Sequence, residues 1–226
     1  MITLLDVSHH YGKGLNAKII LERANFRIND RDKLGILAAT GSGKTSIARM
    51  LAGLTRPRSG LISRRSSLSW PLGFSAAFHP HLSAAENVRL VAALYNLDPI
   101  DLEVRVKVFS ELNAEYYLPV EGLAPGLKGQ LAMALSLSVD FDMYLADELS
   151  AVGSQLFQSK CEAALRERTN DSGLILLTRH VRTIERYCNR FAVLAGARLI
   201  VCEDAAQAVE ILNFDQQKDD THHALF

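Results

Sequence analysis

A glycine-rich stretch that ends in Gly-Lys-Thr carries the clearest chemistry in this sequence. It reads AATGSGKTS and runs from Ala38 to Ser46. The apolar run before it, 33–38, is typical of a short buried strand, and the residues after it place apolar side chains at helical spacing over 44–54. A phosphate-binding loop occurs in this context, between a strand and a helix. The sequence therefore predicts a nucleotide site here.

Each part of the loop has an expected task. Backbone N–H groups at the start of a helix attract phosphate, because the helix dipole favours negative charge there. Lys44 would reach the terminal phosphates, and the Thr45 hydroxyl would be a ligand of Mg²⁺. The residues expected to contact the nucleotide through this loop are Ala38, Ala39, Thr40, Gly41, Ser42, Gly43, Lys44, Thr45 and Ser46.

The first position of the loop departs from the pattern G-x-x-x-x-G-K-[ST], because Ala38 stands where glycine is expected. If the backbone had to adopt a positive φ there, alanine would cost about 1 to 2 kcal/mol. That cost would weaken the loop without abolishing it, since Gly41 and Gly43 remain. The alternative is a chance Gly-Lys-Thr in a surface turn, and the flanking strand and helix disfavour it.

Two adjacent acids supply the second half of such a site. Asp147 and Glu148 follow the apolar run that begins at Met143. We expect this run to be a strand that neighbours the strand before the phosphate loop. Asp147 would then hold Mg²⁺, mostly through water, and Glu148 would polarise the attacking water, a task worth about 10²- to 10⁴-fold in rate. The alternative is an exposed acidic turn at a strand end.

Composition narrows the classes of function. The 226 residues are 48% apolar, enough to bury the core of one domain with a small helical subdomain. The 25 basic and 25 acidic residues balance, which argues against nucleic-acid binding through a basic face. No run approaches the roughly 20 apolar residues of a membrane span, so a membrane role would need a partner. Three scattered cysteines favour a reduced, cytosolic compartment.

The order of predicted elements indicates an α/β fold. The first 28 residues are rich in strand patterns, and helices are expected over 84–97, about 100–112 and about 127–139. Ser83 offers an N-cap to the first of these helices, with Glu86 three residues on, which predicts a capping box. Three later strands alternate with helices, which predicts a parallel sheet wrapped by helices. The polar residues 213–226 are expected to form a frayed tail.

With its parts in this order, the chain resembles the nucleotide-binding subunit of an ABC transporter from about Met1 to Leu212. The finer likeness is to the subgroup that drives export of capsular polysaccharide or O-antigen. Three stretches carry it: SWPLGFSAAFHPHLSAAENV (69–88), LAMALSLSVDFDMYLADE (131–148) and ERYCNRFAVLAGARLIVCEDAAQAVEIL (185–212).

This resemblance implies a fold, ligands and partners. The fold is that of a P-loop NTPase of the ABC ATPase type, with a mixed sheet, an antiparallel β-rich N-terminal part and a helical subdomain. The ATP-binding domain would span 1–212, its helical subdomain about 84–139, and the tail 213–226. ATP and Mg²⁺ would bind, and the partners would be an integral membrane permease and a second ATP-binding subunit, identical or related. The chain would be cytoplasmic and peripheral on the inner face of the bacterial plasma membrane.

The resemblance also implies roles for single residues. Tyr11 is similar to the aromatic residue that stacks on adenine, a contact of about 1 to 3 kcal/mol. LAPGLKGQ (123–130) falls where the family commonly has L-S-G-G-Q, so Gly126 would face the nucleotide of the opposite subunit. A switch histidine is expected after a late strand. Arg179 occupies its position and His180 follows, so either His180 serves or the switch is an arginine.

Several positions depart from the family pattern. Ala124 replaces the signature serine, and no glutamine lies near Gly73 and Phe74. ELSAVGS (148–154) resembles the family's dimer-contact loop, but Ser154 stands where an aspartate is frequent. Two hypotheses follow: a transport ATPase, or an ATP-binding, dimerising regulatory module with little or no hydrolysis. Glu148 favours the ATPase, with reduced activity. A third hypothesis, a P-loop enzyme unconnected with transport, is disfavoured by the helical insertion.

Overall fold

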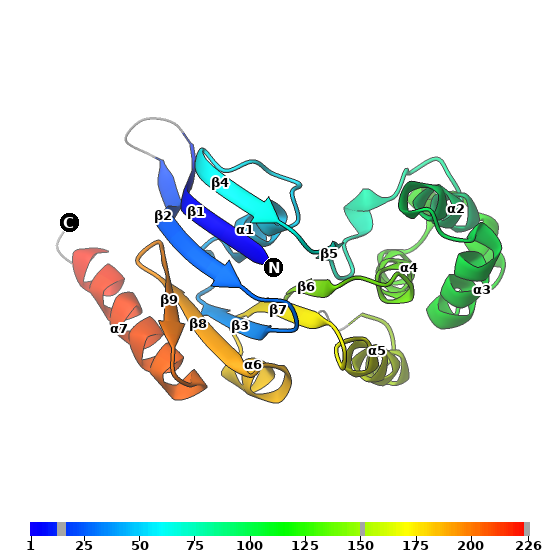
Figure 1. The fold of residues 1–226 in the computed structure, drawn as a ribbon. Coiled ribbons are helices and arrows are strands. Elements are labelled where there is room, and N and C mark those ends of the chain that lie inside the picture. The colour runs from blue at the N-terminus through cyan, green and yellow to red at the C-terminus, as the bar shows by residue number, and fades with distance from the viewer. Residues whose placement is uncertain (13–16, 150–151, 224–226) are drawn as a thin grey trace. The chain divides into compact units, whose positions relative to one another are not determined.

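The described residues form two β-sheets and a set of helices (Figure 1). The computed structural model describes residues 1–12, 17–149 and 152–223. The strands are β1 (Ile2–Tyr11), β2 (Lys18–Ile28), β3 (Lys33–Ala38), β4 (Ser59–Arg64), β5 (Leu68–Pro71), β6 (Met143–Asp147), β7 (Gly173–Thr178), β8 (Arg190–Ala195) and β9 (Arg198–Cys202). The α-helices are α1 (Lys44–Leu51), α2 (Ala84–Tyr95), α3 (Pro99–Ser110), α4 (Pro125–Ser138), α5 (Gln155–Arg168), α6 (Val181–Tyr187) and α7 (Ala205–His223).

The chain divides into two compact units. Unit 1 runs from Met1 to Pro71, from Phe141 to Leu149 and onward from Asp171, and it contains both sheets with α1, α6 and α7. Unit 2 contains α2 to α5. The inserted helices expected over 84–139 therefore belong to a unit that begins earlier, at Leu72, and also includes α5.

Unit 1 combines an antiparallel sheet of order β2-β1-β4 with a sheet of order β5-β6-β7-β3-β8-β9. The second sheet is parallel from β5 to β8, and β9 pairs antiparallel with β8. Helix α1 contacts β5, β6 and β7, whereas α6 and α7 contact β3 from the other side (Figure 1). The predicted mixed sheet and the antiparallel N-terminal part are confirmed.

One apolar core holds α1 against both sheets. Side chains of β1 and β2, of α1 and of β3, β6 and β7 form a single buried cluster. The helix is fixed at its end as well, because the Arg64 guanidinium of β4 donates to the carbonyl oxygens of Leu51, at 2.5 Å, and of Met50. A positive charge at a helix C-terminus also complements the helix dipole. Helix α1 is therefore a rigid base for the side chains at its start.

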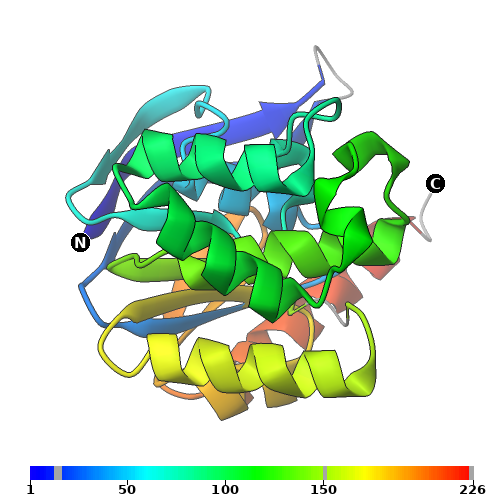
Figure 2. The same cartoon turned by 90° about the vertical axis from the view of Figure 1, so that its right-hand side faces the viewer.

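In unit 2, α2 packs beside α3 and α3 contacts α4 (Figure 2). The capping box predicted for α2 is present: Ser83 Oγ accepts from the Glu86 amide at 3.2 Å, and the Ser83 amide donates to Glu86 Oε2 at 2.8 Å. The Ser83 hydroxyl also donates to Glu86 Oε2, at 2.7 Å, and the two hydrogen bonds that this carboxylate accepts, from the Ser83 amide and then the hydroxyl, lower the pKa of Glu86. Pro99 opens α3 directly after the capping residue Asp98. The helix starts thus follow from local sequence.

The C-terminal end of the described chain is helical, which corrects the expected frayed tail. Helix α7 continues through most of the polar segment, to His223, and 224–226 lie outside the described residues.

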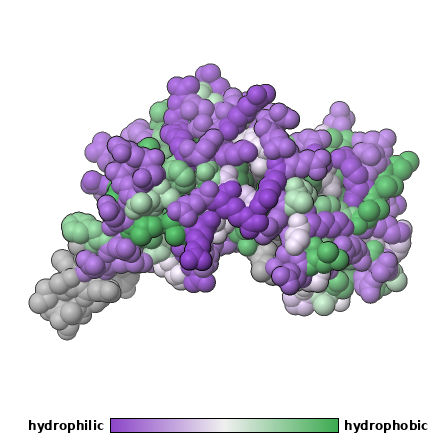
Figure 3. Space-filling view, turned by 90° about the horizontal axis from the view of Figure 1, so that it is seen from below, coloured by the Kyte–Doolittle hydropathy of each residue, from purple (hydrophilic) through white to green (hydrophobic). Residues whose placement is uncertain are grey.

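None of the described helices combines the length and the apolar character that crossing a membrane requires. Polar side chains cover much of the face seen in Figure 3, with apolar ones between them.

Gly35 of β3 gives a test of this packing. A Cβ added to it would lie 2.6 Å from Ile184 Cβ on α6, which must then move. We expect Gly35→Ala to lower the free energy of unfolding by about 1 to 3 kcal/mol, the usual cost of overpacking a core. Urea unfolding measures it. Gly122→Ala is the matched control, because a Cβ there meets nothing within 4 Å. Equal stability of the two variants would contradict the packing of α6 on β3.

Candidate functional site

The predicted phosphate loop follows β3 without strain at the unusual alanine. Ala38 is the last residue of β3, fully buried, and it pairs with Leu194 of β8. Its backbone is therefore extended, a conformation that any residue adopts. The left-handed conformations of the loop belong to Gly41 (φ 77°) and Gly43 (φ 104°). The cost considered for alanine at this position is thus absent.

Gly43 is required for two reasons. It precedes α1 as the capping residue in the left-handed region, and a Cβ there would lie 2.4 Å from Ile20 Cγ2 of β2. The turn before it is closed by Ser42, whose amide and hydroxyl both donate to the Ala39 carbonyl, at 3.3 and 2.8 Å. The exposed Thr40 completes the turn. Loop and helix start therefore form one fixed element.

Lys44 folds back over this loop. Its Nζ donates to the carbonyl oxygens of Ala39 at 2.9 Å and Ala38 at 3.4 Å, and it lies 3.7 Å from Glu148 Oε1. The side chain is only 11% exposed. The ammonium is thus held between the loop and the acid that the sequence assigned to the same site.

The two acids stand at the end of β6, which is not the immediate neighbour of β3. Strand β7 lies between them, and this corrects the expected adjacency. Asp147 is the last residue of β6 and is partly buried. Because β3, β7 and β6 are parallel, their carboxyl ends still meet at one edge, and Lys44 reaches Glu148 across the end of β7.

Glu148 is fastened to the end of β7. Its backbone is left-handed, with φ 62°, and its amide donates to the Leu177 carbonyl at 2.8 Å. Its carboxylate accepts from Thr178 Oγ1 at 2.5 Å through Oε2 and from the Arg179 amide at 3.2 Å through Oε1. Thr178 was missed by the sequence-based prediction. The sequence signal that could have pointed to Thr178 is a hydroxyl residue at the last position of an apolar strand.

The two switch candidates make different contacts. The Arg179 guanidinium donates through Nε to His180 Nε2 at 3.2 Å, while its backbone amide serves Glu148. His180 donates its own amide to Thr178 Oγ1 at 3.1 Å and stands before α6 as its capping residue. The Arg179 amide therefore binds Glu148 directly, whereas the His180 amide is connected to Glu148 through the Thr178 hydroxyl.

Tyr11 lies at the end of β1 and contacts α1. Ser46 Oγ donates to the Tyr11 hydroxyl at 3.0 Å, and Tyr11, 48% exposed, makes a T-shaped contact with the His9 ring, with the ring centroids 5.3 Å apart. Burial lowers the pKa of His9, and the nearby charges of Arg58 and His10 act in the same direction. The His9 ring thus packs against Tyr11. The exposed Thr45 lies in the first turn of α1.

Gly126 is the one predicted site residue outside unit 1. It is exposed in the first turn of α4 in unit 2. Ala124 caps this helix without a side-chain hydrogen bond. In the same unit Ser154, at the position where an aspartate is frequent, caps α5 by accepting from the Phe157 amide at 3.2 Å. Residues 150 and 151, which precede it in the predicted dimer-contact loop, lie outside the described residues.

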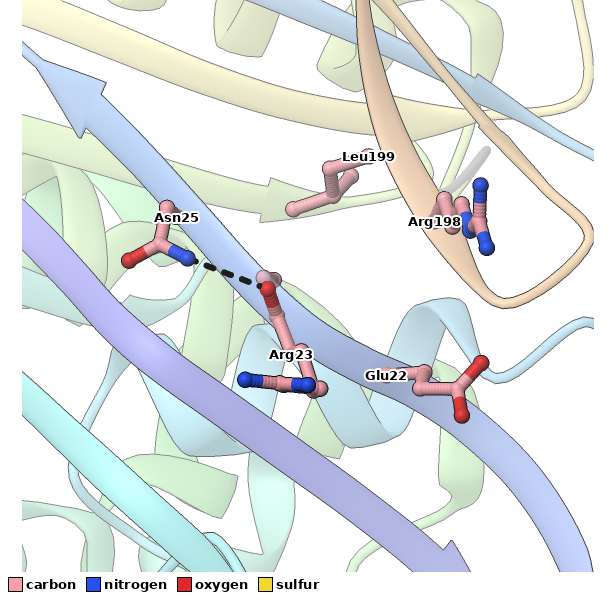
Figure 4. A pocket seen from close by; sticks show the side chains of 6 residues that line it. Glu22, Arg23, Asn25, Arg198 and Leu199 are labelled. Atoms are coloured by element: carbon pink, nitrogen blue, oxygen red, sulfur yellow. Dashed lines mark hydrogen bonds between the residues drawn. The ribbon is translucent and has the colours of Figure 1, made fainter.

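Two cavities of unit 1 bear on the position of the site. One of about 320 Å³ adjoins the phosphate loop and is lined by Ala39 to Ser42 together with Lys18 and Asp215. Another of about 420 Å³ lies between β2 and β9, lined by Glu22, Arg23, Ala24, Asn25, Arg198 and Leu199 (Figure 4). None of the described residues that line this second cavity was predicted to act, whereas the first cavity is lined by residues of the predicted phosphate loop.

Comparisons with known proteins find a matching family and similar chains. The family model described as "ABC transporter" matches residues 21–151. ATP-binding protein BexA of Haemophilus influenzae is 38% identical over 217 residues, which cover 96% of this chain and 100% of BexA. The capsule polysaccharide export ATP-binding protein CtrD of Neisseria meningitidis serogroup B is 36% identical over 213 residues, 94% of this chain and 99% of CtrD.

Among solved structures, the fold is similar to the ATP-binding cassette MJ0796 in a dimeric, post-hydrolysis state bound to ADP and Pi. The TM-score is 0.73 at 18% identity, and the match covers 88% of this chain and 96% of that one. The similarity to BexA and CtrD and the similarity to the solved cassette structure thus each extend over most of the chain.

Proposed function

The chain belongs to the ABC transporter family, and on that basis we propose that it is the ATP-binding subunit of a polysaccharide exporter. It couples binding and hydrolysis of ATP to export of a capsule-type or O-antigen-type polysaccharide through a separate membrane permease. The name of CtrD, a capsule polysaccharide export ATP-binding protein, supports this cargo. So does that of the O-antigen export system ATP-binding protein RfbB of Klebsiella pneumoniae, which is 25% identical over 223 residues, 90% of this chain and 91% of RfbB.

The convergence of Lys44 and Glu148 carries the proposal. An ammonium from the start of α1 and a carboxylate from the end of β6 lie 3.7 Å apart, although β7 separates their strands. Phosphoryl transfer depends chiefly on positioned charges around the phosphates and the attacking water. Both kinds of group meet at this one edge of the sheet.

The nucleotide would be bound by the loop and by Tyr11. Lys44 now donates to the carbonyls of Ala38 and Ala39 and would exchange them for phosphate oxygens, which carry more negative charge. The backbone amides from Ala39 to Ser46 would surround the phosphates. Tyr11, half exposed beside α1, offers a ring face to the adenine.

Mg²⁺ fits the oxygen groups available at this edge. The Thr45 hydroxyl and the Asp147 carboxylate are hard donors of the kind that Mg²⁺ prefers. The described residues contain no cluster of three His, Cys, Asp or Glu side chains, so a metal here would also rely on phosphate oxygens and water. When bound, Mg²⁺ neutralises phosphate charge. Glu148 would then orient and deprotonate the attacking water.

The proposed partners are a second ATP-binding subunit, identical or related, and the permease. Gly126, in the first turn of α4, would face the nucleotide of the second subunit, with the helix start favouring the phosphate. The permease would hold the chain at the inner face of the bacterial plasma membrane.

Ala124 favours the second candidate, a regulatory module with little hydrolysis, because it brings no hydroxyl to that helix start. ATP turnover by the purified chain, with and without its permease, separates the two functions. Turnover that rises with the permease supports the exporter. Nucleotide binding and dimerisation without turnover in either state would support the regulatory module.

Lys44→Ala tests the phosphate loop. We expect ATP affinity to fall about 100-fold or more, because two charge-assisted hydrogen bonds of about 1.5 to 3 kcal/mol each would be lost. Calorimetric titration with ATP measures it. Lys107→Ala is the control, since Lys107 lies in unit 2 and donates to the Tyr117 hydroxyl. Unchanged affinity in Lys44→Ala would overturn the assignment.

Glu148→Gln tests the base. The amide cannot accept a proton from water, so we expect turnover to fall about 10²- to 10⁴-fold while ATP still binds. The variant should accumulate as an ATP-bound dimer in size-exclusion chromatography. Glu185→Gln, which changes an exposed acid of α6, should behave like the parent. A Glu148→Gln variant that hydrolyses ATP at the parental rate would exclude Glu148 as the base.

A further inference from the structure

The carboxylate of Glu148 depends on a side chain that no sequence motif identified. Thr178 is the last residue of β7 and is 1% exposed. We infer that Thr178 is a positioning residue, whose hydroxyl holds Glu148 in the orientation from which it acts on water. This inference rests on the proposed ATPase function and assigns it a further residue.

The hydroxyl of Thr178 accepts one hydrogen bond and donates another. Its oxygen accepts from the His180 amide at 3.1 Å, and it donates to Glu148 Oε2 at 2.5 Å. A backbone N–H can only donate, and a hydroxyl has a single proton. The His180 amide therefore leaves that proton free to point at the carboxylate. The direction of the hydrogen bond follows from the donors and acceptors present.

The backbone of Glu148 gives an independent reason for an anchor. A φ of 62° is uncommon for a residue with a side chain and persists where surrounding contacts hold it. Those contacts come from β7 and the residue after it: the Leu177 carbonyl binds the Glu148 amide, while Thr178 and Arg179 bind the carboxylate. The end of β7 and the residue after it thus hold both the backbone and the carboxylate of Glu148.

The two carboxylate oxygens then have separate tasks. Oε2 is bound by the Thr178 hydroxyl, whereas Oε1 lies 3.7 Å from Lys44 Nζ and accepts from the Arg179 amide at 3.2 Å. Oε1 is therefore the oxygen that adjoins the phosphate loop. Anchoring Oε2 prevents the carboxylate from rotating away from it.

Arg179 makes this anchor more important. Arg179 and His180 are the two candidates for the switch position, and the Arg179 guanidinium is engaged with His180. The described side-chain contacts of Glu148 therefore come from Thr178 and Lys44, and Lys44 would turn to the phosphates on nucleotide binding. Thr178 is the side chain that remains to orient the base.

Thr178→Val and Thr178→Ser test the inference through ATP turnover of the full chain. Valine keeps the shape and removes the hydroxyl, so we expect kcat to fall about 10- to 100-fold, the loss of one hydrogen bond to a charged group, with KM for ATP unchanged. Serine restores the hydroxyl and should return kcat to near the parental value, although it leaves the buried methyl site empty. A loss that serine does not repair, or an unchanged kcat in Thr178→Val, would overturn the positioning role.

A second measurement separates this inference from the proposed function. Thermal unfolding of the nucleotide-free parent, Thr178→Val, Glu148→Ala and the double variant forms a double-mutant cycle. We expect Thr178→Val to lower Tm by about 2 to 8 °C in the parent and by less in the Glu148→Ala background. Equal losses in both backgrounds would overturn the contact. A parent that never hydrolyses ATP would overturn the proposed function, and the cycle would then decide the contact alone.

Discussion

Parallel pairing of β3, β7 and β6 is the constraint on which the site depends. Leu37 pairs with Thr178, and Leu177 pairs with Asp147, so each of the three strands ends within one residue of the strand it pairs with. The residues that follow parallel strands lie at the same edge of the sheet, the edge at the carboxyl ends of the strands. Backbone polar groups at these strand ends are available to form further hydrogen bonds. The phosphate loop, Thr178 and Glu148 meet because this register is kept by the buried core of unit 1.

The same register explains why the altered first residue of the loop is tolerated. Strand β3 continues through Ala38, which pairs with β8, and the chain turns only afterwards. The positions that need a left-handed backbone remain glycine, and at Gly43 the side chain of Ile20 would also exclude a Cβ. A motif can therefore lose a residue without losing its geometry, when that residue does not carry the turn.

Local patterns in the sequence were sufficient to predict much of this arrangement. The loop between β3 and α1, the capping box of α2 and the acids at the end of β6 follow from spacing and residue type, and the structure has each of these elements where it was predicted. The order of strands is not local, so the position of β7 between β3 and β6 was not expected. The left-handed Glu148 and its bond to Thr178 depend on that order. The polar composition after residue 212 indicated fraying, but most of that segment is helical in α7.

The division into two units bears on the departures from the family pattern. Apart from Gly126, the residues proposed to handle the nucleotide belong to unit 1, and their mutual geometry comes from its core. Ala124 and Gly126 begin α4 in unit 2, which has its own packed helices. A change at Ala124 can therefore weaken the proposed contact with a second subunit while Lys44, Thr178 and Glu148 keep their distances. Reduced cooperation between subunits and an intact hydrolytic centre are then compatible in one chain.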